Sequence, residues 1–138
     1  MAKKKDKIQN PGEVIVPVNH PRRPEQHELD AAYTLAHHYQ TTVKFLVPIG
    51  DYKRKSPDIL MRGVIWELKS PKGDSKTTIG TQFRRGSMQA KNIVLDSRRT
   101  KLKYEIIEKQ AIIEAKQRTN LNRVILIDKF GKVVEIKK

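Results

Sequence analysis

Three charged residues in one short stretch have the types and spacing of a hydrolytic metal site. In "PDILMRGVIWELK", residues 57–69, Asp58 follows a proline, and Glu67 and Lys69 are separated by Leu68. Carboxylate oxygens are the hard ligands that Mg²⁺ prefers, and this ion also takes waters and phosphate oxygens. A lysine beside such an ion can orient or deprotonate the attacking water. The stretch predicts a site for Mg²⁺ or Mn²⁺ on Asp58, Glu67 and the Leu68 backbone carbonyl, with Lys69 as a catalytic residue.

A two-residue turn within this stretch would bring the two carboxylates together. Strand side chains alternate between faces, so Glu67 and Lys69 share one face while the apolar residues between them point to the core. With a turn at Arg62 and Gly63, Asp58 pairs with Glu67 on the same face of an antiparallel ladder. Opposed like charges are destabilising unless a cation compensates them. The alternative is a solvated strand end in which Asp58 only caps a turn.

The helix before this stretch supplies a further carboxylate. Apolar residues recur at helical spacing from residue 25 to 39, and Glu28 borders the apolar stripe. A carboxylate beside a buried face is costly unless it has a partner. Glu28 is therefore predicted as a direct or water-mediated metal ligand with a catalytic role. The alternative is that it complements the positive end of the helix dipole.

The helix after the stretch, predicted from about residue 77 to 91, carries a polar stripe. Gln82, Arg85 and Gln89 are spaced by three and four residues beside an apolar stripe that consists of Ile79, Phe83, Gly86 and Ala90. Arg85 can clamp phosphate oxygens with its planar fork. Gln89 is predicted to hold the substrate or a metal-bound water, and Gln82 to assist in substrate binding. The alternative is an ordinary solvated face.

The remaining pattern predicts one mixed α/β domain over residues 24–138. Strands are expected at "TTVKFLVP" and "NIVLD", and a helix at residues 101–118 with Ile106 and Ile113 on its apolar face. "RVILID" and "VVEIKK" predict a C-terminal β-hairpin. Residues 1–23 are expected to form a flexible basic arm, in which "EVIVPV" could be a short edge strand.

Charge is the strongest global property of the chain. There are 29 Lys and Arg residues against 15 Asp and Glu, a net charge of +14, which favours a nucleic-acid partner. Anionic lipid is the alternative partner. The predicted phosphate contacts outside the two helices are Lys53, Arg54, Lys72 and Lys76. The absence of cysteine excludes disulfides and thiolate sites. No apolar stretch approaches the ~20 residues of a membrane span or resembles a signal peptide.

Pro57, Asp58, Glu67 and Lys69, with their spacing, resemble the PD-(D/E)xK nuclease motif. From about residue 25 to 128, through "HELDAAYTLAHHYQTTVKFLVP", "SPDILMRGVIWELKSPKG" and "TTIGTQFRRGSMQAKNIVLD", the chain resembles the C-terminal nuclease domains of bacterial contact-dependent inhibition toxins. This resemblance implies a restriction-endonuclease-like core with a mixed four- to five-stranded sheet flanked by helices.

The resemblance also implies a metal-dependent endonuclease. Relatives of this kind cut tRNA or DNA and are neutralised by a cognate immunity protein. The resemblance therefore implies RNA as the slightly favoured substrate. It also implies that the domain acts in the cytoplasm and is delivered as part of a toxin. The alternatives are a DNA endonuclease or nickase with the same site and a non-catalytic basic module that binds nucleic acid. The sequence leaves the oligomeric state open.

Overall fold

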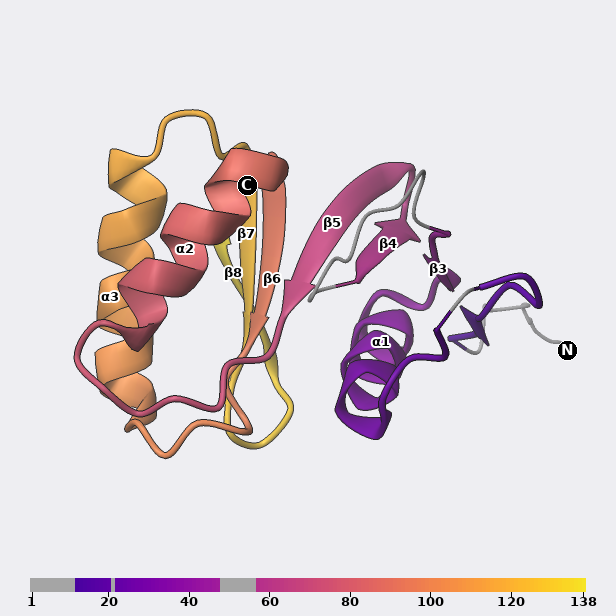
Figure 1. Cartoon of the computed structure of the whole chain (residues 1–138), viewed down its shortest axis with the longest axis horizontal. Helices are drawn as coiled ribbons and strands as arrows, with labels where there is room; N and C mark the ends of the chain where they lie inside the picture. The colour runs from indigo at the N-terminus through magenta and orange to yellow at the C-terminus, as the bar shows by residue number, and fades with distance from the viewer. Residues whose placement is uncertain (1–11, 21, 48–56) are drawn as a thin grey trace, which may run out of the picture.

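The computed structural model describes residues 12–20, 22–47 and 57–138. Within these ranges the chain forms one seven-stranded mixed sheet and three helices (Figure 1). The strands lie in the sheet in chain order: β2 (Val14–Ile15), β3 (Val43–Phe45), β4 (Asp58–Met61), β5 (Val64–Lys69), β6 (Asn92–Asp96), β7 (Arg123–Ile127) and β8 (Val133–Lys137).

Each parallel pair of strands is joined by a helix that crosses over the sheet, as parallel pairing requires. Helix α1 (Gln26–Tyr39) connects β2 to β3, α2 (Thr78–Gln89) connects β5 to β6, and α3 (Tyr104–Gln117) connects β6 to β7. The pairs β3–β4, β4–β5 and β7–β8 are antiparallel. The three helices and the C-terminal hairpin confirm the predicted elements.

The sheet separates two hydrophobic clusters. On one face, α1 packs on alternate residues of the strands, including Ile59, Trp66 and Leu68. On the other face, α2 and α3 pack together on Ile93, Leu95, Val124 and Leu126. Figure 1 shows α2 and α3 side by side on one side of β6–β8, with α1 on the other. Strand β5 therefore lies between two helical layers, which explains why both of its faces are buried near its end.

The turn between β4 and β5 sets the register of the candidate site. Arg62 and Gly63 both have positive φ, 55° and 77°, as a two-residue type I′ hairpin turn requires. Met61 then pairs with Val64, and the ladder continues without a bulge to Asp58 opposite Glu67. The predicted register is confirmed at every position.

The sheet is larger than expected. The resemblance implied four to five strands, whereas the described residues form seven. The difference arises because β7 pairs directly with β6, so that the C-terminal hairpin joins the sheet instead of standing apart. At the other edge β2 pairs with β3. Residues 14 and 15 fall in the range assigned to a basic arm, and they extend the sheet through backbone hydrogen bonds.

Helix α3 buries a different stripe from the one that the sequence predicted. Ile107, Ala111 and Ala115 face the sheet, and Ile106 and Ile113 are exposed. Adjacent isoleucines occupy both sides of this helix, so the apolar pattern alone gave two similar stripes. No helix among the described residues is long and apolar enough to cross a membrane.

Candidate active site

Asp58 and Glu67 stand opposite each other at the end of the β4–β5 ladder. The Leu68 N–H donates to the Pro57 carbonyl at 3.0 Å, which makes residues 57 and 68 a hydrogen-bonded pair. The next pair along an antiparallel ladder is non-hydrogen-bonded, and its side chains lie closer together. The Asp58–Glu67 pair therefore occupies the position where two carboxylates approach each other most closely.

Glu67 and Lys69 form a buried ion pair on the same face of β5. The Lys69 Nζ lies 3.2 Å from Glu67 Oε2. The exposed fraction is 0% for Glu67 and 7% for Lys69. Between them Leu68 points to the α1 side, so both charges face the layer of α2 and α3. A buried carboxylate needs a compensating charge, and the ammonium of Lys69 provides it in the protein itself.

Helix α2 approaches this ion pair closely at Gly86. A Cβ atom placed on Gly86 would lie 2.7 Å from Ile93 Cδ1 and 3.5 Å from Lys69 Cε. A glycine at this point therefore allows the helix to pack against the aliphatic part of Lys69. The three apolar residues Ile79, Phe83 and Gly86 are buried as predicted.

Asp58 and Gln89 line the same hollow, which has a volume of about 460 Å³. Its wall includes the end of α2 and the hairpin residue Ile65, together with Lys91, Asn92 and Arg123. Gln82 is half-buried and Arg85 is exposed on α2. Neither is among the residues that line the hollow, so the structure associates only Gln89 of the polar stripe with Asp58.

Glu28 is buried near the start of α1, as its place beside the apolar stripe predicted. Its carboxylate accepts a hydrogen bond from the Glu25 backbone N–H at 2.9 Å and completes a capping box. Arg22 Nη2 lies 3.9 Å from Glu28 Oε2. Helix α1 covers the face of β5 opposite to Glu67 and Lys69. The structure thus shows a capping role for Glu28, and its role as a metal ligand stays a prediction.

Two of the other predicted phosphate contacts, Lys72 and Lys76, lie among the described residues. Lys72 and Lys76 are exposed between β5 and α2. Lys76 lines a separate hollow between α2 and α3. Lys53 and Arg54 lie outside the described residues. Neither Lys72 nor Lys76 is among the residues that line the hollow beside Asp58.

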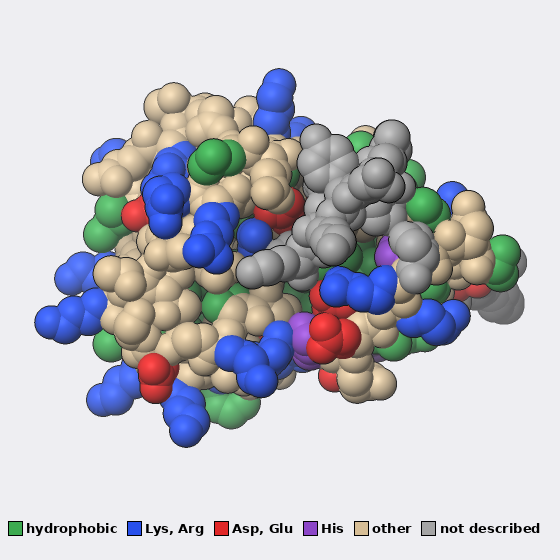
Figure 2. All heavy atoms as spheres, in the orientation of Figure 1, with side chains coloured by type: hydrophobic (Ala, Val, Ile, Leu, Met, Phe, Trp, Pro, Cys, Tyr) green, Lys and Arg blue, Asp and Glu red, His purple; other side chains and the backbone are tan. Residues whose placement is uncertain are grey.

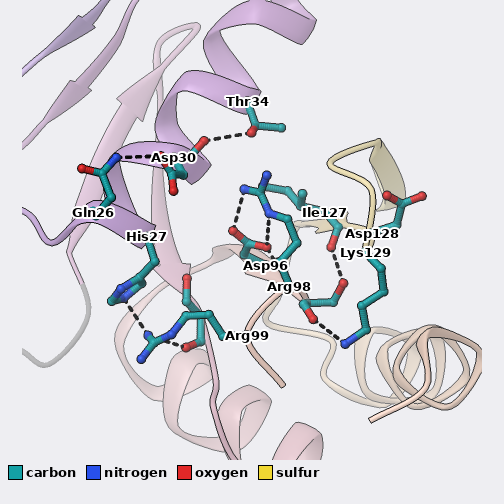
Figure 3. Close-up of polar contacts among 12 residues, drawn as sticks. Gln26, His27, Asp30, Thr34, Asp96, Arg98, Arg99, Ile127, Asp128 and Lys129 are labelled. Atoms are coloured by element: carbon teal, nitrogen blue, oxygen red, sulfur yellow. Dashed lines mark hydrogen bonds and ion pairs between the residues drawn. The ribbon is translucent and has the colours of Figure 1, made fainter. Parts of the chain in front are cut away.

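The sequence did not single out Arg99. This residue belongs to the loop after β6, and its side chain contacts Ser70, the residue that follows β5. Its Nη1 donates to the Ser70 carbonyl at 3.1 Å and lies 2.7 Å from His27 Nε2. Figure 3 shows this guanidinium reaching toward His27 at the start of α1. The segment "DSRRT" follows the predicted strand "NIVLD", and residues after adjacent parallel strands meet at one end of a sheet. This rule could have predicted from the sequence that Arg99 lies near the end of β5.

Beside it, Arg98 serves a structural role. Its guanidinium donates to both carboxylate oxygens of Asp96, at 2.9 and 2.8 Å (Figure 3). The hydrogen bonds that Arg98 donates to the Asp96 carboxylate raise the pKa of Arg98 above its ordinary value. This pair fixes the loop after β6, and so helps to hold the backbone that carries Arg99.

The donor set at the end of the hairpin fits a hard divalent cation. Asp58 and Glu67 offer carboxylate oxygens from opposed positions. Pro57 has no N–H, so it cannot return a ladder hydrogen bond to the Leu68 carbonyl. Among the described residues no group of three or more His, Cys, Asp or Glu side chains is placed to hold a metal. A cation here would thus depend on two carboxylates, a carbonyl, waters and substrate oxygens, which is the coordination that Mg²⁺ accepts.

Comparison with known proteins places the chain in a family. The model of the family described as "Contact-dependent growth inhibition CdiA C-terminal domain" matches residues 55–133, more than half of the chain. No curated protein matches the sequence.

A solved structure is similar in fold. It is described as "CdiA-CT/CdiI toxin and immunity complex from Burkholderia pseudomallei" and has a TM-score of 0.62 and 23% sequence identity. The match covers 89% of this chain and 98% of that chain. At this identity the likeness concerns the fold alone. From the family match over the region that contains the hairpin, the chain belongs to the CdiA C-terminal domains of contact-dependent growth inhibition, a family of toxin domains.

Proposed function

We propose that this domain is a metal-dependent endonuclease that hydrolyses phosphodiester bonds in RNA, with tRNA as the favoured substrate. The observation that carries the proposal is the meeting of Asp58, Glu67 and Lys69 at one end of one hairpin, with Lys69 Nζ 3.2 Å from Glu67. The motif resemblance and the family support the nuclease class. The preference for RNA rests on the resemblance to toxin nucleases.

Asp58, Glu67 and the Leu68 carbonyl would hold Mg²⁺ or Mn²⁺, and Glu28 would support the ion through a water. When bound, the ion supplies charge stabilisation on the phosphate and lowers the pKa of a coordinated water. Lys69 positions the attacking water, because burial and the Glu67 carboxylate fix its ammonium in one place. Gln89 orients the substrate from the rim of the hollow that it shares with Asp58.

The basic surface supports a polyanionic substrate. Figure 2 shows lysine and arginine side chains over much of this face of the molecule, with acidic side chains at fewer places. Because the net charge is +14, the long-range electrostatic field of the protein is positive and attracts a polyanion. Arg85, Gln82, Lys72 and Lys76, with Lys53 and Arg54, are proposed to contact phosphates along the strand.

The family suggests where the activity operates. The similar solved structure is a complex of a toxin with its immunity protein. We propose that this chain is likewise neutralised by a cognate immunity protein, and that it is delivered as the toxin portion of a larger protein and acts in the cytoplasm of the recipient cell.

The proposal is tested by incubating the protein with total tRNA, single-stranded DNA and duplex DNA, each with Mg²⁺, Mn²⁺ or EDTA. We expect cleavage of tRNA with either metal and none in EDTA. Glu67→Gln should lose cleavage. Glu114→Gln is the matched control, because Glu114 pairs with Arg118 on α3, away from the hairpin.

Three outcomes would contradict parts of the proposal. Cleavage in EDTA would remove the metal requirement. Faster cleavage of DNA than of tRNA would reassign the substrate. Binding of nucleic acid without cleavage in either metal would identify a non-catalytic module.

A further inference from the structure

The hollow beside Asp58 has features that the hydrolytic residues do not require. Asp58 is the carboxylate among its lining residues, which also include the cations Lys91 and Arg123. We propose that this hollow is a nucleotide subsite, which holds the phosphate and the sugar or base next to the scissile bond. The proposal rests on the proposed nuclease function and adds residues from β6 and β7 to it.

The fold brings the two cations together by backbone contacts. Arg123 begins β7 and pairs in register with Asn92, the first residue of β6. The Lys91 carbonyl accepts hydrogen bonds from the N–H groups of Asn122 and Arg123, at 2.7 and 3.5 Å. The loops before β6 and β7 are thereby tied to each other. Both cations sit on well-anchored backbone at one end of the sheet, which is a suitable base for binding a phosphate.

Asn92 connects this cationic wall to the catalytic hairpin. Its Nδ2 donates to the Ile65 carbonyl of β5 at 3.1 Å. Its Oδ1 accepts a hydrogen bond from Arg123 Nη1 at 3.4 Å. Because the amide is buried, it is a fixed link rather than a surface contact. Arg123 is thus held by a side chain of β6, and that side chain is in turn bonded to β5, the strand that carries Glu67 and Lys69.

The hairpin side of the hollow is apolar. Ile65 lies on the same face of β5 as Glu67 and Lys69, yet it is 54% exposed. An exposed isoleucine that lines the same hollow as a carboxylate and two cations offers contact area to a sugar or a base. The volume of about 460 Å³ is in the range of small-ligand sites. Gln89 adds an amide that can hydrogen-bond a base edge or a phosphate oxygen.

The test measures binding of a fluorescein-labelled, mixed-sequence, single-stranded RNA octamer by anisotropy, in EDTA and over a range of salt. Arg123→Gln and Lys91→Gln should each weaken binding on the order of tenfold at low salt and reduce the log–log salt slope by about 0.7. Arg123→Lys should keep the slope. Ile65→Ser should weaken binding roughly threefold with an unchanged slope, because its contact is not ionic.

Matched controls are Arg84→Gln, on the groove between α2 and α3, and Lys109→Gln on the exposed side of α3. These should change affinity less than the subsite variants and leave the slope near that of the unaltered protein. Thermal melting of each variant verifies folding. The subsite is overturned if Arg123→Gln and Lys91→Gln behave like their controls.

Cleavage of tRNA in Mg²⁺ separates this proposal from the nuclease proposal. If the unaltered protein cleaves tRNA and Arg123→Gln raises KM, the nuclease proposal and the subsite proposal are both supported. If the unaltered protein does not cleave but Arg123→Gln still weakens octamer binding, the nuclease proposal fails and the subsite stands. If cleavage occurs and Arg123→Gln changes neither KM nor binding, the subsite alone fails.

Discussion

Lys69 has two roles that compete for the same ammonium group. It neutralises the fully buried Glu67 carboxylate at 3.2 Å, and it is the proposed positioning group for the attacking water. A metal bound to Glu67 would take over part of the neutralisation and leave Lys69 for the water. Under this proposal the ion pair neutralises Glu67 in the metal-free protein, and the opposed Asp58 carboxylate would make metal binding more favourable.

Replacement of Lys69 by methionine tests the structural role. We expect Lys69→Met to lower the free energy of unfolding by about 3 kcal/mol in EDTA, because it leaves the buried Glu67 carboxylate without this ammonium. Saturating Mg²⁺ should restore part of the loss, since binding to the folded state stabilises it. Thermal melts with and without Mg²⁺ measure both effects. Equal melting temperatures for Lys69→Met and for the exposed control Lys101→Met in EDTA would contradict the buried pair.

Replacement of Lys69 by alanine tests the catalytic role. Lys69→Ala should retain metal and RNA binding while cleavage falls by orders of magnitude, because the proposed role of the lysine is to position the water and not to hold the ion. Asp58→Ala should lose metal binding and cleavage together. Calorimetric metal titration and cleavage assays distinguish the two patterns. If both variants cleave like the unaltered protein, these charges are only the end of a strand.

At the scale of elements, the contact between α2 and β5 sets how far the helix lies from the site. Gly86 allows that contact, because a side chain there would press on Ile93 and reach the aliphatic part of Lys69. In an exposed helix an alanine would be preferred to glycine by about 1 kcal/mol. At this position the overpacking cost of about 1–3 kcal/mol should exceed that gain.

A double-mutant cycle measures this packing. We expect Gly86→Ala to destabilise the protein by about 1 kcal/mol, and Gly86→Ala with Ile93→Val to be more stable than the sum of the single changes predicts, since valine lacks the Cδ1 atom. Urea denaturation gives the four free energies. Strict additivity would mean that the helix moves instead of pressing on Ile93.

The hairpin shows what the sequence could predict at this scale. A two-residue turn at Arg62 and Gly63 is compatible with only one strand register. The pairing of Asp58 with Glu67 could therefore be predicted from the turn alone. The sequence could not show that the first residue of β7 lies next to this hairpin, since that depends on strand order. It also assigned the wrong face to α3, because isoleucines lie on two sides of that helix. Glu28 was correctly expected to be buried, but its capping contact depends on the geometry of the first turn.

At the scale of the whole molecule, the positive charge should govern association with nucleic acid. The net charge of +14 is spread along the chain instead of being confined to one tail. Each phosphate contact releases counterions, so affinity should fall with salt by a log–log slope of about 0.7 to 0.9 per contact. Several contacts would thus make the affinity for tRNA strongly salt-dependent.

Anisotropy titrations of labelled tRNA from low to moderate salt test this expectation. Replacement of the added salt by an equal concentration of neutral betaine is the control and should leave the affinity unchanged. An affinity that stays flat as salt rises would contradict the role of the basic surface. The sequence was sufficient for this prediction, because net charge does not depend on the fold.

The order in which the chain is assembled follows from the spacing of the site residues. Asp58, Glu67 and Lys69 lie within twelve residues of sequence, and a hairpin of this length closes in microseconds. Arg123 joins them only after β7 has paired with β6, which closes a longer loop than the two-residue hairpin turn does. If the chain refolds after delivery, as proposed, we expect the proposed metal ligands to meet before the proposed subsite is complete. The last strands to pair would then determine when the domain first becomes active.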